Sequence, residues 1–241
     1  MPKRSRDPLT LHRPMAAPTA HKNPLLSGAM AEVDLGDLTA PAVHARPARR
    51  NRRRAKDLRN EQSAAAAIAD FDRDTDLVGL TCGRFSLLHL IGATLAKTGP
   101  AHFSISTWTA ADYELRALHS IIERGDITGT RWLIDFSMCR REPATTQQMR
   151  ELFGWDSIRV AQVHAKFCLF QNADWRVVCR SSMNLNQNPR TEDFELAHDP
   201  ELCAFYNAIL DETFSWQPRT LADDRPYAII KEIQRHQHAD D

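Results

Sequence analysis

The 241-residue chain has no run of eighteen apolar residues, so no membrane-spanning helix is expected. Its N-terminus lacks the apolar core that a secretory signal needs, and a cytoplasmic protein is therefore the expectation. The five cysteines are odd in number and form no Cys-x-x-Cys pair, which argues against a zinc ribbon and against a disulfide framework. The formal net charge is +0, so no overall electrostatic field draws the chain toward nucleic acid.

The chain is 42% hydrophobic, which is enough for the core of one domain with appendages. Residues 1–60 are rich in Pro, Ala, His and Arg and show no apolar period, so they are predicted to be disordered. Residues 61–76 form a predicted linker, helical at first and then acidic. The folded domain is predicted over 77–215, and 216–241 form a predicted helix and polar tail.

Basic residues gather in one segment, 46–59, which has eight of them against the single acidic Asp57, a local charge of +7. Such a segment binds phosphates through counterion release with little sequence preference. The candidate substrate-binding residues are therefore Arg49, Arg50, Arg52, Arg53 and Arg54. The alternative is a solubilising arm or a segment that docks a partner.

Helical and strand patterns alternate through the predicted domain. Helices are predicted over 85–95, 110–123, 143–153 and 200–214, and strands over 101–107, 130–136 and 158–163. This order indicates parallel strands joined by helical crossovers, the α/β class. Two further strands, 166–170 and 175–179, flank a polar turn and predict an antiparallel hairpin.

The residues that could carry chemistry lie around that hairpin, within 163–196. His164 precedes its first strand, Lys166 begins that strand, and Ser182 and Asn184 follow the second strand. Antiparallel pairing would bring these two sites together at one end of the sheet. A neutral imidazole is a nucleophile near pH 7, while an ammonium and an amide can hold the oxygens of a phosphodiester. A carboxylate such as Glu195 could fix the imidazole tautomer. No metal or other cofactor is needed for this scheme.

This stretch resembles the HKD motif of the phospholipase D superfamily, in which His-x-Lys is followed by Asp, Gly-Ser-x-Asn and Glu. His164, Lys166, Ser182, Asn184 and Glu195 fall on the pattern. Gln171 occupies the place of the Asp, and Asp174, three residues later, is the candidate if the turn is lengthened. Ser181 replaces the Gly. The resemblance implies a phospholipase D-like lobe, with a mostly parallel sheet, helical crossovers and the antiparallel hairpin that carries the motif.

The chain has one His-x-Lys motif, whereas the enzymes it resembles use two, one histidine as nucleophile and the other as general acid. The resemblance therefore implies a homodimer that pairs two copies of His164. The leading hypothesis is a metal-independent endonuclease that acts on DNA or RNA through a phosphohistidine intermediate. The alternatives are a catalytically inactive DNA-binding or assembly protein that keeps the fold, and a lipid phosphodiesterase or transferase.

Overall fold

The structure of the protein is a computed structural model that describes residues 52–216. The first part of the predicted arm, with Arg49 and Arg50, lies outside the described residues. The helix and polar tail predicted over 216–241 also lie outside them from residue 217 on. Among the described helices, none combines the length and the apolar character that crossing a bilayer requires.

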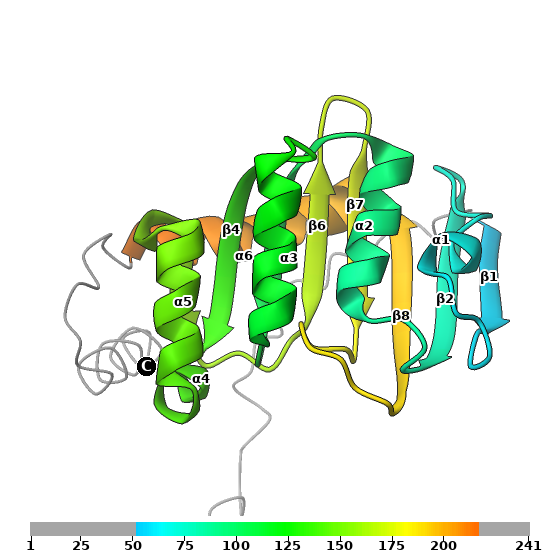
Figure 1. Cartoon of the computed structure of the whole chain (residues 1–241). Helices are drawn as coiled ribbons and strands as arrows, with labels where there is room; N and C mark the ends of the chain where they lie inside the picture. Colours follow the sequence, from blue (N-terminus) through cyan, green and yellow to red (C-terminus); the bar gives the residue numbers. More distant parts are fainter. Residues whose placement is uncertain (1–51, 217–241) are drawn as a thin grey trace, which may run out of the picture. The chain divides into compact units, whose positions relative to one another are not determined.

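The described residues form one eight-stranded sheet and its flanking helices (Figure 1). The strands are β1 Arg52–Asp57, β2 Thr75–Cys82, β3 Ala101–Thr107, β4 Ile127–Asp135, β5 Ile158–Ala161, β6 Phe167–Gln171, β7 Arg176–Ser181 and β8 Thr191–His198. The helices are α1 Ala64–Ala67, α2 Leu87–Thr98, α3 Asp112–Glu123, α4 Phe136–Arg141, α5 Pro143–Phe153 and α6 Pro200–Trp216, with a short 3-10 turn η1 at Trp155–Ser157.

The strand order across the sheet is β1-β2-β8-β7-β6-β3-β4-β5. Strands β3, β4 and β5 pair in parallel, as the alternating helices and strands predict. Strands β6 and β7 form the predicted antiparallel hairpin. The antiparallel part extends beyond that hairpin, because β8 pairs with both β7 and β2, and β6 pairs with β3. The sheet is therefore mixed, with a parallel set of strands on one side of the hairpin.

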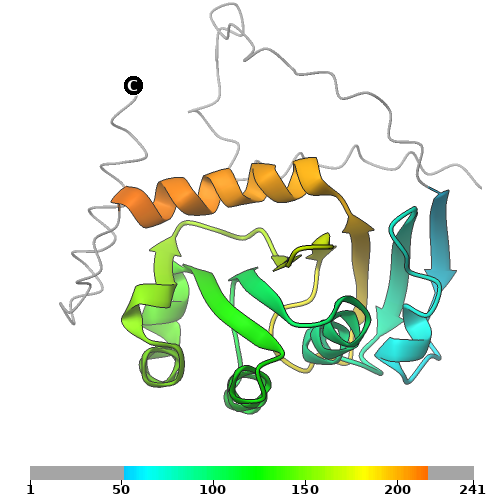
Figure 2. The ribbon, with the colours of Figure 1, turned by 90° about the horizontal axis from the view of Figure 1, so that it is seen from above.

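Helices cover the two faces of the sheet unequally (Figure 2). Helices α1 to α5 lie on one face, where the main core forms around the fully buried Trp132, Phe103 and Phe170. Helix α6 crosses the opposite face and covers a smaller cluster that includes Phe167 and Leu169. Strands β6 and β7 thus have apolar side chains on both faces, which explains why β6 is a continuous apolar run.

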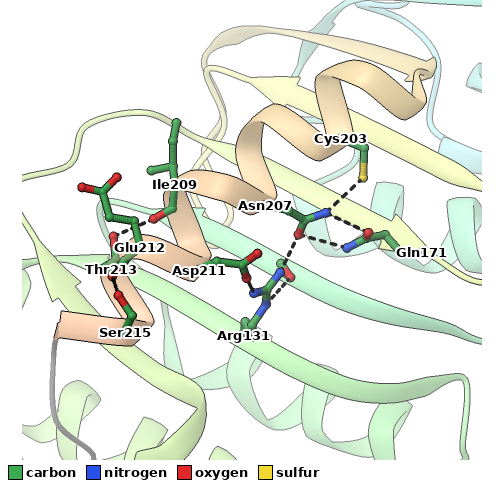
Figure 3. A network of polar contacts seen from close by, with 10 residues as sticks. Arg131, Gln171, Cys203, Asn207, Ile209, Asp211, Glu212, Thr213 and Ser215 are labelled. Atoms are coloured by element: carbon green, nitrogen blue, oxygen red, sulfur yellow. Dashed lines mark hydrogen bonds and ion pairs between the residues drawn. The ribbon is translucent and has the colours of Figure 1, made fainter.

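Polar contacts fix α6 to the sheet (Figure 3). Asn207 of α6 donates to Gln171 of β6 at 2.8 Å and accepts from the amide of the same residue at 3.2 Å. The guanidinium of Arg131, on β4, donates to Asn207 and also to Asp211 one turn further along the helix. Arg131 is mostly buried and Asp211 is exposed, so these contacts lie where the interface between the helix and the sheet meets solvent.

The predicted elements of the domain are present with small changes at their ends. The strand over 101–107 and the helix over 143–153 have the predicted bounds, as β3 and α5. Helix α2 runs to Thr98, where Gly99 ends it with a φ of +77°. Strands β2 and β8 and helix α4 were not predicted from the sequence.

The prediction of disorder as far as residue 60 is wrong for β1. This strand pairs in parallel with β2 over all six residues, and Leu58 after it is buried. Nearly all of its side chains are charged, so it lacks the alternation of apolar and polar residues that usually marks a strand. The acidic linker supplies the partners. Asp70 accepts from Arg54 and Lys56 at 3.1 and 2.9 Å, and Asp72 pairs with Arg52 at 3.5 Å.

Candidate active site

The candidate site lies along one edge of the sheet. Strands β3, β4, β5 and β7 end at this edge, and the antiparallel strands β6 and β8 begin there. The loops that carry His164, Lys166, Ser182 and Asn184 all leave the sheet at this edge. The predicted pairing is therefore present, and it gathers residues from both sides of the β6–β7 hairpin.

Hydroxyl groups at the end of β3 position the His164 segment. Ser106 donates to the carbonyl of Ala165 at 2.8 Å, between the two motif residues. The amide of Ser181, at the end of β7, donates to the carbonyl of Lys166 at 3.2 Å. Thr107, next to Ser106, accepts from the amide of Leu185 at 3.4 Å. One strand end thus holds the loop before β6 and the loop after β7.

The ring of His164 is exposed and meets Trp108, which directly follows β3. The two rings lie edge to face with their centroids 5.7 Å apart. The guanidinium of Arg141 lies over the Trp108 ring, 3.9 Å from its centroid, and also donates to the Trp108 carbonyl at 3.4 Å. Among the described residues, none donates to or accepts from a ring nitrogen of His164. Its imidazole is free to meet a substrate.

Lys166 is half-buried beside it and donates to the carbonyl of His164 at 3.0 Å. Burial lowers the pKa of its ammonium, and the carboxylates of Glu192 and Asp135 act in the opposite direction. Asp135, at the end of β4, accepts from the amide of Val163 at 3.0 Å and caps α4 through Ser137. A partly desolvated cation at this place interacts more strongly with an anion than one in bulk water.

Ser182 lies against Glu192, the second residue of β8. Its hydroxyl donates to the Glu192 carboxylate and accepts from the amide of Asp193 at 3.0 Å. The other carboxylate oxygen of Glu192 accepts from the side chain of Asn188 at 3.0 Å. The carboxylate that belongs to this cluster is therefore Glu192, which the sequence analysis did not single out.

Asn184 contributes to a small pocket behind Ser182. The lining residues are Thr81, Gly83, Phe85, Ser86, Met183, Asn184, Asn186, Asn188 and Glu192. The side-chain oxygens of Asn184, Asn186 and Thr81 are buried there without a hydrogen-bond partner. Buried oxygens of this kind normally bind water or a ligand donor.

Glu195, the carboxylate predicted for the site, makes different contacts. It lies three residues beyond Glu192 along β8, roughly 10 Å at about 3.3 Å per residue and on the opposite face of the sheet. There it pairs with Arg180 of β7 and with Arg53 of β1, the latter at 3.4 Å. The two glutamates lie on opposite faces because side chains alternate along a strand, and the sequence shows this only if β8 is recognised as a strand.

Asp174 is not part of the cluster. It lies in the turn between β6 and β7, at the far end of the hairpin from Lys166, roughly 20 Å away at about 3.3 Å per residue. It is exposed and pairs with Arg73 at 3.5 Å. The turn is built by Asn172, whose side-chain oxygen accepts from the amides of Asp174 and Trp175. Asp174 is thus an ordinary turn residue.

The described arginines of the basic segment all have acidic neighbours. Arg52, Arg53 and Arg54 pair with Asp72, Glu195 and Asp70, respectively. Arg59, after the strand, pairs with Asp57 at 2.6 Å and lowers the pKa of that carboxyl to about 2. In the part of the segment that the structure describes, 52–59, the basic charge is therefore balanced by nearby carboxylates.

Trp108 and Arg141 were not among the candidate residues predicted from the sequence. Trp108 directly follows β3, and its ring meets that of His164. Arg141 lies over the Trp108 ring, and its position depends on α4 turning back toward β3. Only the fold brings the three residues together, because β3 and α4 both precede His164 in the chain.

Comparison with known proteins gives matches among solved structures. No protein-family model matches the chain, and no curated protein matches it. A phospholipase D family member, Nuc from Salmonella typhimurium, is 17% identical, with a TM-score of 0.37 over 58% of this chain and 93% of that one. NucT from Helicobacter pylori is 14% identical, with a TM-score of 0.42 over 58% and 96%.

A polyphosphate kinase from Porphyromonas gingivalis also matches, at 14% identity and a TM-score of 0.42. That match covers 57% of this chain and only 26% of the kinase. All three similarities have TM-scores below 0.5 and identities of 14–17%.

Proposed function

We propose that this protein is a metal-independent phosphodiesterase that cleaves nucleic acid, with His164 as its nucleophile. The observation that carries the proposal is the convergence of His164, Lys166 and Ser182 at one sheet edge, with the His164 ring exposed. Lys166, Ser182 and Asn184 are the groups that would stabilise charge on the phosphoryl oxygens in the transition state. Lys166 is well suited to this role because it is partly desolvated.

In the proposed reaction a ring nitrogen of His164 attacks phosphorus and forms a P–N bond, while the bond to the leaving oxygen breaks. A second imidazole donates a proton to that oxygen. Water then attacks the phosphohistidine, losing a proton to the same imidazole, and the P–N bond breaks. Because the chain has one His-x-Lys motif, we propose that the second imidazole belongs to another copy of the chain, in a homodimer with a two-fold axis beside the site.

The proposal is tested by incubating the purified protein with mixed DNA and RNA in excess EDTA. We expect cleavage by the wild type, and a loss of at least about a hundredfold in His164→Ala, the usual scale for removing a general base or nucleophile. His119→Ala is the matched control, because that histidine lies on α3 and contacts Glu123 and Phe153. Cleavage that disappears with EDTA, or that survives in His164→Ala, would contradict the proposal.

A second function, nucleic-acid binding or assembly without catalysis, is favoured by the contacts of Ser181 and Glu192. The Ser181 hydroxyl donates to the carbonyl of Asp193 at 2.7 Å, where the motif that it resembles has Gly. Both oxygens of Glu192 are engaged by Ser182 and Asn188, and none of the described carboxylates orients His164. Under this alternative, a gel shift without cleavage is expected, and His164→Ala leaves the shift unchanged.

A further inference from the structure

We propose that a single-stranded nucleic acid lies along the sheet edge that carries His164. Its phosphates would contact Arg84, Arg190 and Arg140, and an unstacked base would rest on Tyr113. This inference rests on the proposed function and names the strand form and the residues that bind it. It places substrate binding on the folded edge rather than on the basic segment that stands out in the sequence.

The three arginines share two properties. All are exposed, and within residues 52–216 none has a carboxylate partner. Arg52, Arg53, Arg54 and Arg59, by contrast, each pair with an aspartate or glutamate. A phosphate that binds a paired arginine must compete with the carboxylate already there, whereas an unpaired arginine releases only counterions. Three exposed arginines without a carboxylate partner among the described residues therefore lie at the candidate site.

The strand order places these arginines one after another along this edge of the sheet. Arg84 follows the end of β2, Arg190 precedes the start of β8, and Arg140 lies in α4 just after the end of β4. Between β2 and β4 there are five strand intervals, roughly 24 Å at about 4.8 Å each. His164 and Lys166 precede β6, which lies between those ends. The arginines thus flank the proposed nucleophile on both sides, as a strand that passes across it requires.

The aromatic residue at this edge favours a single strand. Tyr113 lies in the first turn of α3, directly after the loop from β3, and is 70% exposed, the most exposed large hydrophobic residue described. Trp108 precedes the same turn but is half-buried, with Arg141 on its ring. An exposed ring beside free cations is the usual platform on which an unpaired base stacks, and a duplex keeps its bases out of reach.

The test uses the full-length chain with the His164→Ala substitution, so that binding is measured without cleavage. Fluorescence anisotropy with a labelled single-stranded DNA is recorded over a series of salt concentrations. Substituting Arg84, Arg140 and Arg190 together by Gln should weaken binding by at least about tenfold. It should also reduce the slope of log K against log salt by about 2, since each single-strand phosphate contact contributes about 0.7.

The matched control substitutes Arg73, Arg116 and Arg124 by Gln, which changes the net charge equally at exposed arginines that already have acidic partners. It should leave both affinity and slope near the parent values. Tyr113→Ala should weaken single-strand binding by about tenfold to a hundredfold and leave the affinity for a duplex of the same sequence unchanged.

The proposal is overturned if the edge triple variant binds as the parent does, or if both triple variants lose affinity equally. It is also overturned if Tyr113→Ala affects duplex and single strand alike. Cleavage by the wild type with no effect of the edge variants would reject this binding path and leave the proposed function standing. Binding that depends on Arg84, Arg140 and Arg190, without any cleavage, would support this binding path and reject the proposed function.

Discussion

Gly83 follows β2 and lies against Asn188 and Pro189 in the loop after β7, and replacing it by Ala tests that contact. Its φ is +66°, and a Cβ there would lie 2.5 Å from the carbonyl oxygen of Asn188 and 2.5 Å from Cα of Pro189. Both contacts are with backbone, which cannot rotate away as a side chain does. The loop would have to move, and with it Asn188, which holds Glu192 at 3.0 Å.

The magnitude follows from two contributions. An L-residue in the left-handed region costs about 1–2 kcal/mol, and overpacking against a fixed backbone adds about 1–3 kcal/mol. Gly83→Ala should therefore lower the free energy of unfolding by about 2–4 kcal/mol, allowing for the smaller entropy of the unfolded Ala chain. Gly125→Ala is the control, because its φ is +83°, it ends α3 as a left-handed glycine, and no atom lies within 4 Å of the added Cβ. It should cost only about 1 kcal/mol.

Urea denaturation followed by circular dichroism gives the two free energies, and the cleavage assay gives the effect on the site. Gly83→Ala should lose cleavage at temperatures where it is still folded, while Gly125→Ala keeps it. Equal destabilisation of the two variants would refute the steric argument. Full activity in a destabilised Gly83→Ala would show that the position of the Asn188 loop does not matter for catalysis.

Three further outcomes are expected. Glu192→Gln should reduce cleavage by about tenfold or more, while Glu195→Gln should leave it within about twofold, because only Glu192 contacts the cluster. A larger loss in Glu195→Gln than in Glu192→Gln would instead support Glu195, the glutamate that the motif favours. Asn207→Leu should lower the free energy of unfolding by about 1–3 kcal/mol, as its bonds to Arg131 and Gln171 are lost; an unchanged urea midpoint would argue against that anchor. A thiol reagent should modify the half-buried Cys82 first and Cys179 only on unfolding, because burial raises the pKa of the Cys179 thiol to about 12; early labelling of Cys179 would contradict its burial.

The parallel strands and their helices were predictable because each has a clear local signal. Strand β3 alternates between small polar and apolar residues, and Pro143 and Gly154 bracket α5 as start and stop. The hairpin was also predictable, since Asn172 and its neighbours form a polar turn between two apolar runs. These signals were enough to place His164, Lys166 and Ser182 at one edge.

The remaining strands lack such signals for physical reasons. Strand β1 has exposed charged residues that find their partners only in the folded chain, so its sequence resembles that of a disordered arm. Strand β8 carries Glu192, Asp193 and Glu195 among its eight residues, a composition typical of a loop. Missing β8 is also why the motif favoured Glu195: without the strand, nothing in the sequence separates it from Glu192.

The two outer strands of the sheet bear on how the protein stays apart from its own copies. An outermost strand leaves unpaired backbone groups that can recruit another chain and extend the sheet without limit. Here β5 has only four residues, and β1 carries three arginines and a lysine among its six. A short strand offers few backbone groups, and the charged side chains along β1 would have to be desolvated for a second strand to pair with it. Neutralising substitutions in β1 should therefore promote aggregation before they affect any activity, which makes solubility the first property to measure in such variants.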